Sequence, residues 1–213
     1  MTVTQLLRSD LHRIGALVPE GSRVLDLGCG SGTLMAYLRD ERSCEVRGLE
    51  IDLTRISAAI GRGLPVVQGD LDEGLSGYPD DSFDVAVLAQ TLQVVRSPSL
   101  VLSEMLRVAD TAIVSFPNFG HWRVRAHLAL KGRMPVSRAI PYTWYETPNI
   151  HHTTIADFRD FVAAHGGVLT REVALHTDGH SVRPVSWAPN LRADLAIAVV
   201  TRRDRLAAAS GPA

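Results

Sequence analysis

The chain has 213 residues, a formal net charge of −1 and 46% hydrophobic side chains, which is typical of one globular domain with a full apolar core. A charge so close to zero provides no long-range attraction to nucleic acid or to anionic membranes. Only two cysteines are present, Cys29 and Cys44, and no apolar run approaches the roughly 18 residues of a membrane span. We therefore expect a cytoplasmic protein with reduced cysteines that binds neither nucleic acid nor membranes.

Apolar patterns alternate between helical and strand-like spacing over the first half of the chain. Leucines and an isoleucine at helical spacing predict a helix over residues 6–17, which Pro19 and Gly21 end. Short apolar runs bounded by turn residues predict five strands, at residues 23–27, 46–51, 64–67, 83–88 and 111–116. Helical patterns fill the intervals, at residues 33–39, 54–60 and 100–108. This alternation favours a parallel sheet with helices on both faces.

The alternation breaks after the fifth strand. Residues 118–149 are rich in aromatic residues, prolines and arginines and show no clean period, whereas residues 155–164 return to helical spacing. Two final strands, 168–176 and 193–201, are joined by a link too short for a crossover helix, so they should pair antiparallel. The predicted fold class is α/β, a Rossmann-like, doubly wound, mostly parallel sheet with a terminal antiparallel strand. This is the fold of class I methyltransferases.

We expect one domain over residues 1–206. An aromatic and basic insertion at about 118–152 interrupts it, and residues 207–213 form a frayed tail. Three roles stay open for the insertion: a lid over a substrate pocket, a docking surface, or a loop packed on its own aromatic side chains.

A glycine-rich turn follows the first strand. Gly28, Gly30 and Gly32 can adopt positive φ and let the backbone approach a ligand closely, and the next helix points unpaired N–H groups at the turn. The spacing differs from the dinucleotide fingerprint G-x-G-x-x-G. Asp26, beside the turn, would repel a diphosphate but suits the ammonium group of a methionyl ligand. The turn therefore predicts a nucleoside ligand with a cationic tail.

Further polar residues at successive strand ends complete the predicted cofactor site. Glu50 lies about 20 residues after the turn, where a carboxylate accepts hydrogen bonds from ribose hydroxyls. Its loss should weaken cofactor binding and change stability little, because a strand-end carboxylate carries no core packing. Asp70 could accept from an adenine amine or could be a turn former, and Gln90 could contact the methionyl part or the backbone. The predicted site comprises Asp26, Gly28, Cys29, Gly30, Gly32, Glu50, Ile51, Asp70, Leu71 and Gln90.

The chain offers no motif for methylating nucleic-acid bases. The fourth strand runs into Ala89-Gln90-Thr91-Leu92-Gln93, which differs from the Asn/Asp-Pro-Pro-Tyr/Phe box that holds an sp² nitrogen in amino-methylating enzymes. If the protein is an enzyme, His121 or His151 in the insertion could act as general base near neutral pH. The pair His151-His152 lacks a third ligand at metal spacing, so we expect no metal site.

The run Val24–Gly32 resembles motif I of class I S-adenosylmethionine-dependent methyltransferases. Five further runs resemble the methionine biosynthesis protein MetW family: Gln68–Leu75, Gln90–Gln93, Ser115–Trp122, Gly132–Val136 and Trp144–His151. Most of these runs lie outside the common methyltransferase motifs, so the resemblance is specific to the family. One departure is Ser31, where many members carry an acidic residue.

The resemblance implies a protein of methionine synthesis that binds S-adenosylmethionine or S-adenosylhomocysteine. It implies homoserine O-acyltransferase as the partner, with this chain as an accessory or regulatory subunit. Trp122, Trp144 and Tyr145 are then the candidate interface residues, since aromatic side chains are enriched at interface hot spots. The alternative is an active methyltransferase that acts on an unidentified small molecule. The catalytic residues, the methyl acceptor and the choice between acetyl and succinyl transfer stay undetermined.

Overall fold

The computed structural model describes residues 9–137, 140–178 and 181–209. Its strands are β1 (Arg23–Leu27), β2 (Glu45–Glu50), β3 (Val66–Gln68), β4 (Phe83–Ala89), β5 (Ala109–Pro117), β6 (Gly167–Asp178), β7 (Ser181–Pro184) and β8 (Leu195–Arg202). Its helices are α2 (Ser9–Gly15), α3 (Thr33–Arg42), α4 (Leu53–Ile60), α5 (Pro98–Val108), α6 (Trp122–Lys131), α7 (Ile155–Ala164), α8 (Pro189–Arg192) and α9 (Arg203–Ala209), with a 3₁₀ turn, η1 (Leu71–Glu73).

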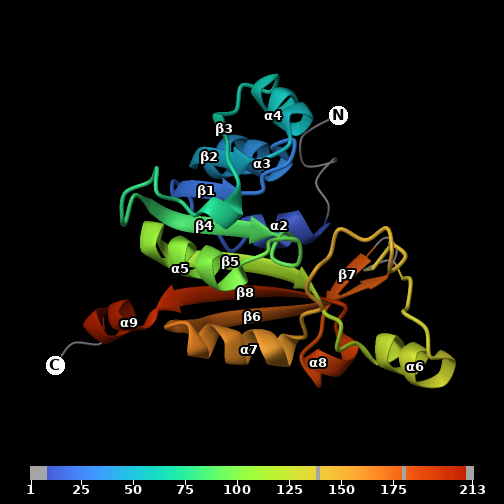
Figure 1. Cartoon of the computed structure of the whole chain (residues 1–213). Coiled ribbons are helices and arrows are strands. Elements are labelled where there is room, and N and C mark those ends of the chain that lie inside the picture. Colours follow the sequence, from blue (N-terminus) through green and yellow to red (C-terminus); the bar gives the residue numbers. More distant parts are fainter. Residues whose placement is uncertain (1–8, 138–139, 179–180, 210–213) are drawn as a thin grey trace.

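The eight strands form one sheet in the order β3-β2-β1-β4-β5-β8-β6-β7 (Figure 1). The first five strands run parallel, and β8 lies antiparallel between β5 and β6. The expected fold class is thereby confirmed, as is the antiparallel pairing of the last two predicted strands. The structure adds a short edge strand, β7, which pairs with β6.

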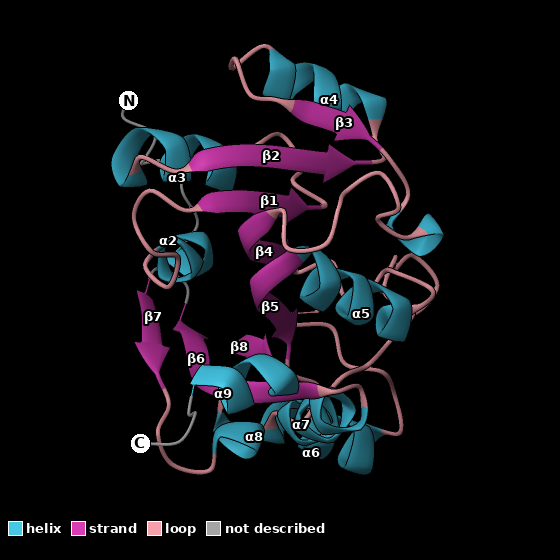
Figure 2. Ribbon diagram, turned by 90° about the vertical axis from the view of Figure 1, so that its left-hand side faces the viewer, coloured by secondary structure: helices cyan, strands magenta, loops and turns pink. Residues whose placement is uncertain are grey.

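Helices cover both faces of the sheet, because each presents an apolar stripe to it. Leu102 and Met105 of α5 and Phe158 of α7 belong to one buried cluster with β4 and β5. Ile14 of α2 and Leu38 of α3 belong to a second cluster on the opposite face. Figure 2 shows α5 on the opposite side of the sheet from α2 and α3.

Besides β7, the structure differs from the sequence predictions in the insertion and near both ends of the chain. Residues 122–131 of the insertion form helix α6, which shows no helical period because none of its residues is buried. At the C-terminus, α9 continues through residues 207–209 of the expected tail, and residues 210–213 lie outside the described part. Of the predicted helix 6–17, residues 6–8 lie outside the described part and α2 ends at Gly15.

The carboxyl ends of the parallel strands meet at one edge of the sheet. Leu27 of β1 is in register with Leu49 of β2 and with Leu88 of β4. The loops that follow these three strands therefore start side by side. In the part of the chain that the structure describes, no helix is long and apolar enough to cross a membrane.

Candidate functional site

The glycine turn has the backbone conformation that its sequence predicts. Gly28, Gly30 and Gly32 have φ values of 68°, 57° and 75°, in the region that favours glycine. A Cβ atom at Gly28 would lie 2.7 Å from Oγ1 of Thr91, so a side chain there would clash. The N–H groups of Gly28 and Cys29 donate to the carbonyl oxygen of Leu49, at 2.8 and 3.1 Å. The turn is thus fixed against the end of β2.

A cavity of about 1140 Å³ opens at this edge of the sheet. Its wall includes each predicted cofactor residue except Gly32, which is the N-cap of α3. The insertion closes another side, through Pro141, Tyr142, Pro148 and Asn149. The cavity exceeds the range of about 300–1,000 Å³ typical of small-molecule sites, so it has room for more than one small ligand.

Glu50 is held by the backbone around it. Its side chain is buried, with 4% exposed, and it accepts hydrogen bonds from the N–H groups of Gly30, Ile51 and Asp52, at 2.8, 2.9 and 3.1 Å. A carboxylate has about four acceptor positions, so one remains for a ligand hydroxyl. These hydrogen bonds argue against the expectation that Glu50 contributes little to stability, because its loss would leave three N–H groups near the turn without their acceptor.

Asp26 is a buried carboxyl group that faces the cavity. Its residue is 2% exposed, and no donor in the described part of the chain forms a hydrogen bond with it. Burial, and secondarily the nearby charge of Glu50, raise its pKa to about 7. A buried carboxyl group without a partner is costly, so a cationic ligand group beside Asp26 would stabilise its charged form. Burial also raises the pKa of the adjacent Cys29 thiol to about 12, which keeps it uncharged.

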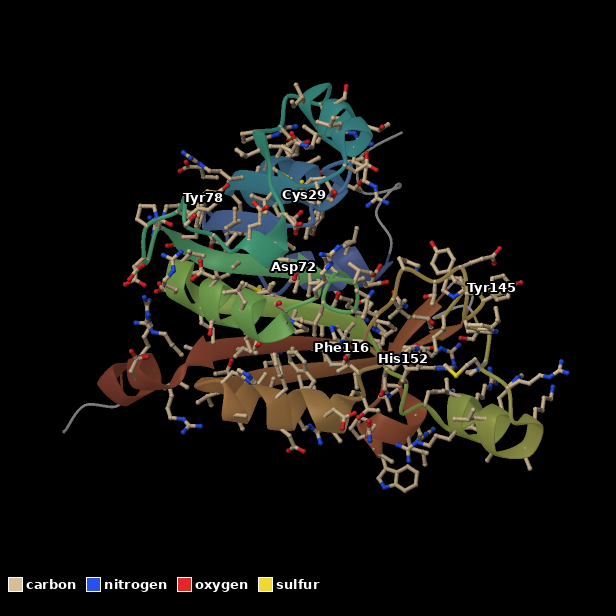
Figure 3. The ribbon with its side chains drawn as sticks, in the orientation of Figure 1. Cys29, Asp72, Tyr78, Phe116, Tyr145 and His152 are labelled. Carbon is tan, nitrogen blue, oxygen red and sulfur yellow. The ribbon has the colours of Figure 1, made fainter. Side chains whose placement is uncertain are left out.

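The loop after β3 combines both interpretations of Asp70. Oδ1 of Asp70 accepts from the N–H of Asp72 at 2.9 Å and caps η1, while the residue also lines the cavity. Asp72, which Figure 3 labels, accepts from the N–H groups of Arg96 and Ser97 and so ties this loop to the start of α5. Asp70 is thus a turn former that still presents a carboxylate to the cavity.

The loop after β4 connects both sides of the cavity. Gln90, at φ 52°, donates through Nε2 to Oδ2 of Asp10 in α2. Nε2 of Gln93 donates to the carbonyl oxygen of Gln90 at 2.8 Å, and the carbonyl oxygen of Gln93 accepts from the N–H groups of Ile150 and His151. Among the described residues, Oε1 of Gln93 has no hydrogen-bond partner although it is buried, and Gln93 lines the cavity. The predicted cofactor site omits Asp10 and Gln93. The only sequence signal for Gln93 is its spacing of three residues from Gln90.

The insertion divides into an inward and an outward part. Tyr142 lines the cavity, whereas Trp144 and Tyr145 are 73% and 69% exposed and contact each other edge to face. Figure 3 shows Tyr145 on the outer loop, well away from Cys29. Trp122, at the start of α6, is 49% exposed.

Neither candidate base lines the large cavity. His121 is buried and faces a second, smaller cavity; burial lowers its pKa, and its Nδ1 accepts from the N–H of Arg123 at 3.2 Å. Nε2 of His151 is buried without a hydrogen-bond partner, and His151 is absent from the cavity wall. Within the described residues, no group of three or more histidine, cysteine or acidic residues could hold a metal ion.

Known structures resemble this chain in fold. An S-adenosylmethionine-dependent methyltransferase from Thermotoga maritima, described as a possible histamine N-methyltransferase, has a TM-score of 0.69 and 20% identity over 92% of this chain and 88% of its own. Magnesium protoporphyrin IX methyltransferase from Synechocystis, solved with bound SAH, has a TM-score of 0.61 and 19% identity over 91% of this chain and 82% of its own. The chain thus has the class I methyltransferase fold.

The sequence matches are more specific. A relative from Rhodopirellula baltica, named bifunctional methionine biosynthesis protein MetXA/MetW, is 38% identical over an alignment of 209 residues that covers 93% of this chain and 33% of the relative. The chain therefore spans about a third of that relative's length. Residues 8–200 match the family model described as methionine biosynthesis protein MetW. The chain belongs to the MetW family.

Proposed function

We propose that this chain is a cytoplasmic, S-adenosylmethionine-binding accessory subunit that supports or regulates homoserine O-acyltransferase in methionine synthesis. The observation that carries the partnership is the relative from Rhodopirellula baltica, whose name joins MetXA and MetW in one polypeptide. Fusion gives two modules a high effective concentration, which is useful when they act together. The same pair can then operate as separate chains in contact.

The proposed cofactor is S-adenosylmethionine or S-adenosylhomocysteine, and the residues on the cavity wall fit it. Asp26 is a buried carboxyl group to which no described residue donates a hydrogen bond, and this suits the ammonium group of the methionyl tail. Glu50 has one free acceptor position for a ribose hydroxyl, and Asp70 keeps an acceptor oxygen for an adenine amine. Leu71 and Ile51 supply apolar surface beside them.

The proposed interface with the acyltransferase is the outward part of the insertion. Trp144 and Tyr145 form one exposed aromatic pair, and Trp122 lies at the other end of the same insertion. Large exposed aromatic side chains are the usual anchors of protein interfaces. The inward Tyr142 connects this surface to the cavity wall, so a ligand in the cavity and a partner outside could influence each other through one short segment.

Two measurements test this proposal. Isothermal titration at neutral pH should show that S-adenosylmethionine and S-adenosylhomocysteine bind, whereas NAD binds much more weakly. Co-expression of the tagged chain with the host's homoserine O-acyltransferase should give a stable complex with higher acyltransfer activity than the enzyme alone. Tight NAD binding would overturn the cofactor, and independent migration of the two proteins with unchanged acyltransferase activity would overturn the partnership.

A second candidate function is methyl transfer to a small molecule. The large cavity favours it, since its volume exceeds that of typical single-ligand sites, and Oε1 of Gln93 offers an unused acceptor in its wall. Conversion of S-adenosylmethionine to S-adenosylhomocysteine in a small-molecule extract separates the two functions. Turnover that does not depend on the acyltransferase would favour the enzyme.

A further inference from the structure

A second cavity, of about 290 Å³, lies between α6 and the ends of β6 and β8. Figure 1 shows α6 beside these strand ends, away from the glycine turn at β1. Its polar wall contains His121, Arg123 and His127 from the insertion, His176 from β6 and Asp194 directly before β8. These residues come from three distant parts of the sequence, and none of them belongs to the predicted cofactor site.

Two imidazole rings of this wall stack on each other: His121 is buried, whereas 35% of the His176 side chain is exposed. Nδ1 of His121 accepts from the N–H of Arg123, so the proton of the neutral ring lies on Nε2, which is then a donor. The ring of His176 is parallel to that of His121, with centroids 5.8 Å apart. Nδ1 of His176 is buried without a hydrogen bond, although Oδ2 of Asp194 lies 3.3 Å away. The pair therefore offers polar atoms that the protein itself leaves unused.

The charge balance of this wall favours an anion. Its one carboxylate, Asp194, already accepts from the backbone N–H and the hydroxyl of Thr177. In residues 9–137, 140–178 and 181–209, no acidic side chain forms an ion pair with Arg123 or His127. The wall thus carries Arg123, whose guanidinium Cζ lies 5.4 Å from the ring centroid of Trp122, and three histidines against one carboxylate.

The remaining wall combines an apolar part with the polar residues Asn118, Ser137 and Thr177. Val124 of α6 and Val136 and Ile140 of the following segment line the cavity. The volume lies at the lower end of the range for small-molecule sites. A compact ligand that carries both a negative charge and a short hydrocarbon chain matches both parts of the wall.

We propose that this cavity binds a small aliphatic carboxylate, with the carboxylate group toward Arg123 and His121 and the hydrocarbon chain toward Val136 and Ile140. The site is separate from the cofactor cavity, but Thr177 lines both. Occupancy of one cavity can therefore be sensed at the wall of the other.

The experiment uses n-butyrate as probe on the full chain, with n-butylamine and inorganic phosphate as comparison probes. Ring signals of the histidines are followed by NMR and assigned with His121→Gln, His127→Gln and His176→Gln. Butyrate should shift the signals of His121 and His176 in a saturable way, phosphate should bind more weakly, and butylamine should have no saturable effect. Equal binding of butylamine, or no saturable shift with butyrate, would overturn the proposal.

A matched pair of variants locates the site. Arg123→Gln should weaken butyrate binding at least tenfold, whereas Lys131→Gln, which removes the same charge from the exposed end of α6, should leave it unchanged. Thermal melts and S-adenosylmethionine titrations of both variants should match the parent, which separates this site from the cofactor proposal. Equal losses in the two variants would mean that butyrate responds only to the charge of the helix, and the cavity assignment would fail.

Discussion

The two sides of the large cavity are held in place by different means. At the ends of β1 and β2, the backbone fixes the functional groups. Glu50 accepts hydrogen bonds from three N–H groups, and the glycine turn donates hydrogen bonds to the carbonyl oxygen of Leu49. On the side of the insertion, α6 has no buried residue and Trp144 is largely exposed. The hydrogen bonds to the rest of the chain lie at the two ends of the insertion, among them those at Asn118 and at Ile150 and His151, and the described residues between 122 and 149 form none.

This difference suggests a division of work. A preorganised site loses little entropy when it binds a ligand of constant shape, such as a cofactor. A segment with few anchors and large exposed aromatic side chains can adapt to a protein surface, where side-chain rearrangement on binding is common. The comparison therefore predicts that changes at the strand ends affect cofactor binding and stability, whereas changes in the outer insertion affect partner binding alone.

The largest effect is expected at Asp26. Its pKa is raised to about 7 in the folded protein from an ordinary value of 3.8, so the folded state binds the proton more tightly than the unfolded state. The stability gained from this tighter proton binding is fully present below the ordinary pKa of 3.8 and is lost as the pH rises through about 7. A shift of about three pKa units corresponds to about 4 kcal/mol. Asp26→Asn should therefore be more stable than the parent at pH 8 and should gain little at pH 4.

Urea unfolding of both proteins at several pH values measures this difference. Asp84→Asn is the matched control, because hydrogen bonds from Arg23 lower the pKa of Asp84 and give the opposite sign. That variant should lose stability at neutral pH. Asp26→Asn should also lose S-adenosylmethionine affinity, since it cannot pair with an ammonium group. If the difference in the free energy of unfolding between the parent and Asp26→Asn does not depend on pH, the pKa of Asp26 is not raised by burial.

Glu50→Ala should have the next largest effect. It removes the acceptor of three backbone N–H groups, so we expect the free energy of unfolding to fall by about 3 kcal/mol together with a loss of cofactor affinity. Glu45→Ala, at the exposed start of the same strand, should change neither. Denaturant titrations and calorimetric binding measure the two effects. An unaltered unfolding midpoint in Glu50→Ala would show that the turn does not depend on this carboxylate.

The cavity wall at the strand ends was predictable from the sequence because its signals are local. The glycines that follow β1 and the acidic residues that follow β2 and β3 each mark a strand end, and parallel strands bring such ends together. Local apolar runs likewise predicted the sheet, and the short link between the last two strands predicted their antiparallel pairing. The three hydrogen bonds that Glu50 accepts were not predictable, since they depend on where the N–H groups of the folded turn point.

The insertion was less predictable because its structure depends on contacts between distant residues. Helix α6 buries no residue and therefore leaves no apolar period to detect. The role of Gln93 arises from Ile150 and His151, which lie far along the chain. His121, His176 and Asp194 share a cavity only because β5, β6 and β8 are neighbours in the sheet. The spacing of these three residues in the sequence therefore does not predict that they share a cavity.

Trp144→Ala tests the outer insertion. If this side chain anchors the acyltransferase, its removal should cost about 2 kcal/mol of binding free energy and leave the melting temperature and cofactor affinity unchanged. Trp187→Ala is the control, because Trp187 is 72% exposed and lies outside the insertion. Affinity for the immobilised partner is measured for both. Lost cofactor affinity with intact partner binding would instead make the outer insertion part of a lid.

The smallest change in stability is expected for Gln93→Met, which also tests whether the large cavity holds a second ligand. Gln93 loses one hydrogen bond in this variant, from Nε2 to the carbonyl oxygen of Gln90, but its buried, unpartnered Oε1 disappears as well. Because these terms oppose each other, the free energy of unfolding should change by less than about 1 kcal/mol. The backbone bonds that hold Ile150 and His151 stay in place, so the insertion keeps its anchor. Gln68→Met, at the exposed end of β3, controls for the substitution itself.

If Oε1 of Gln93 accepts a hydrogen bond from a methyl acceptor, Gln93→Met should bind S-adenosylmethionine normally and lose turnover in a small-molecule extract. If the parent is active and Gln93→Met has the same turnover, Gln93 is not part of the acceptor site. A large loss of stability in Gln93→Met would show that the amide of Gln93 stabilises the fold instead.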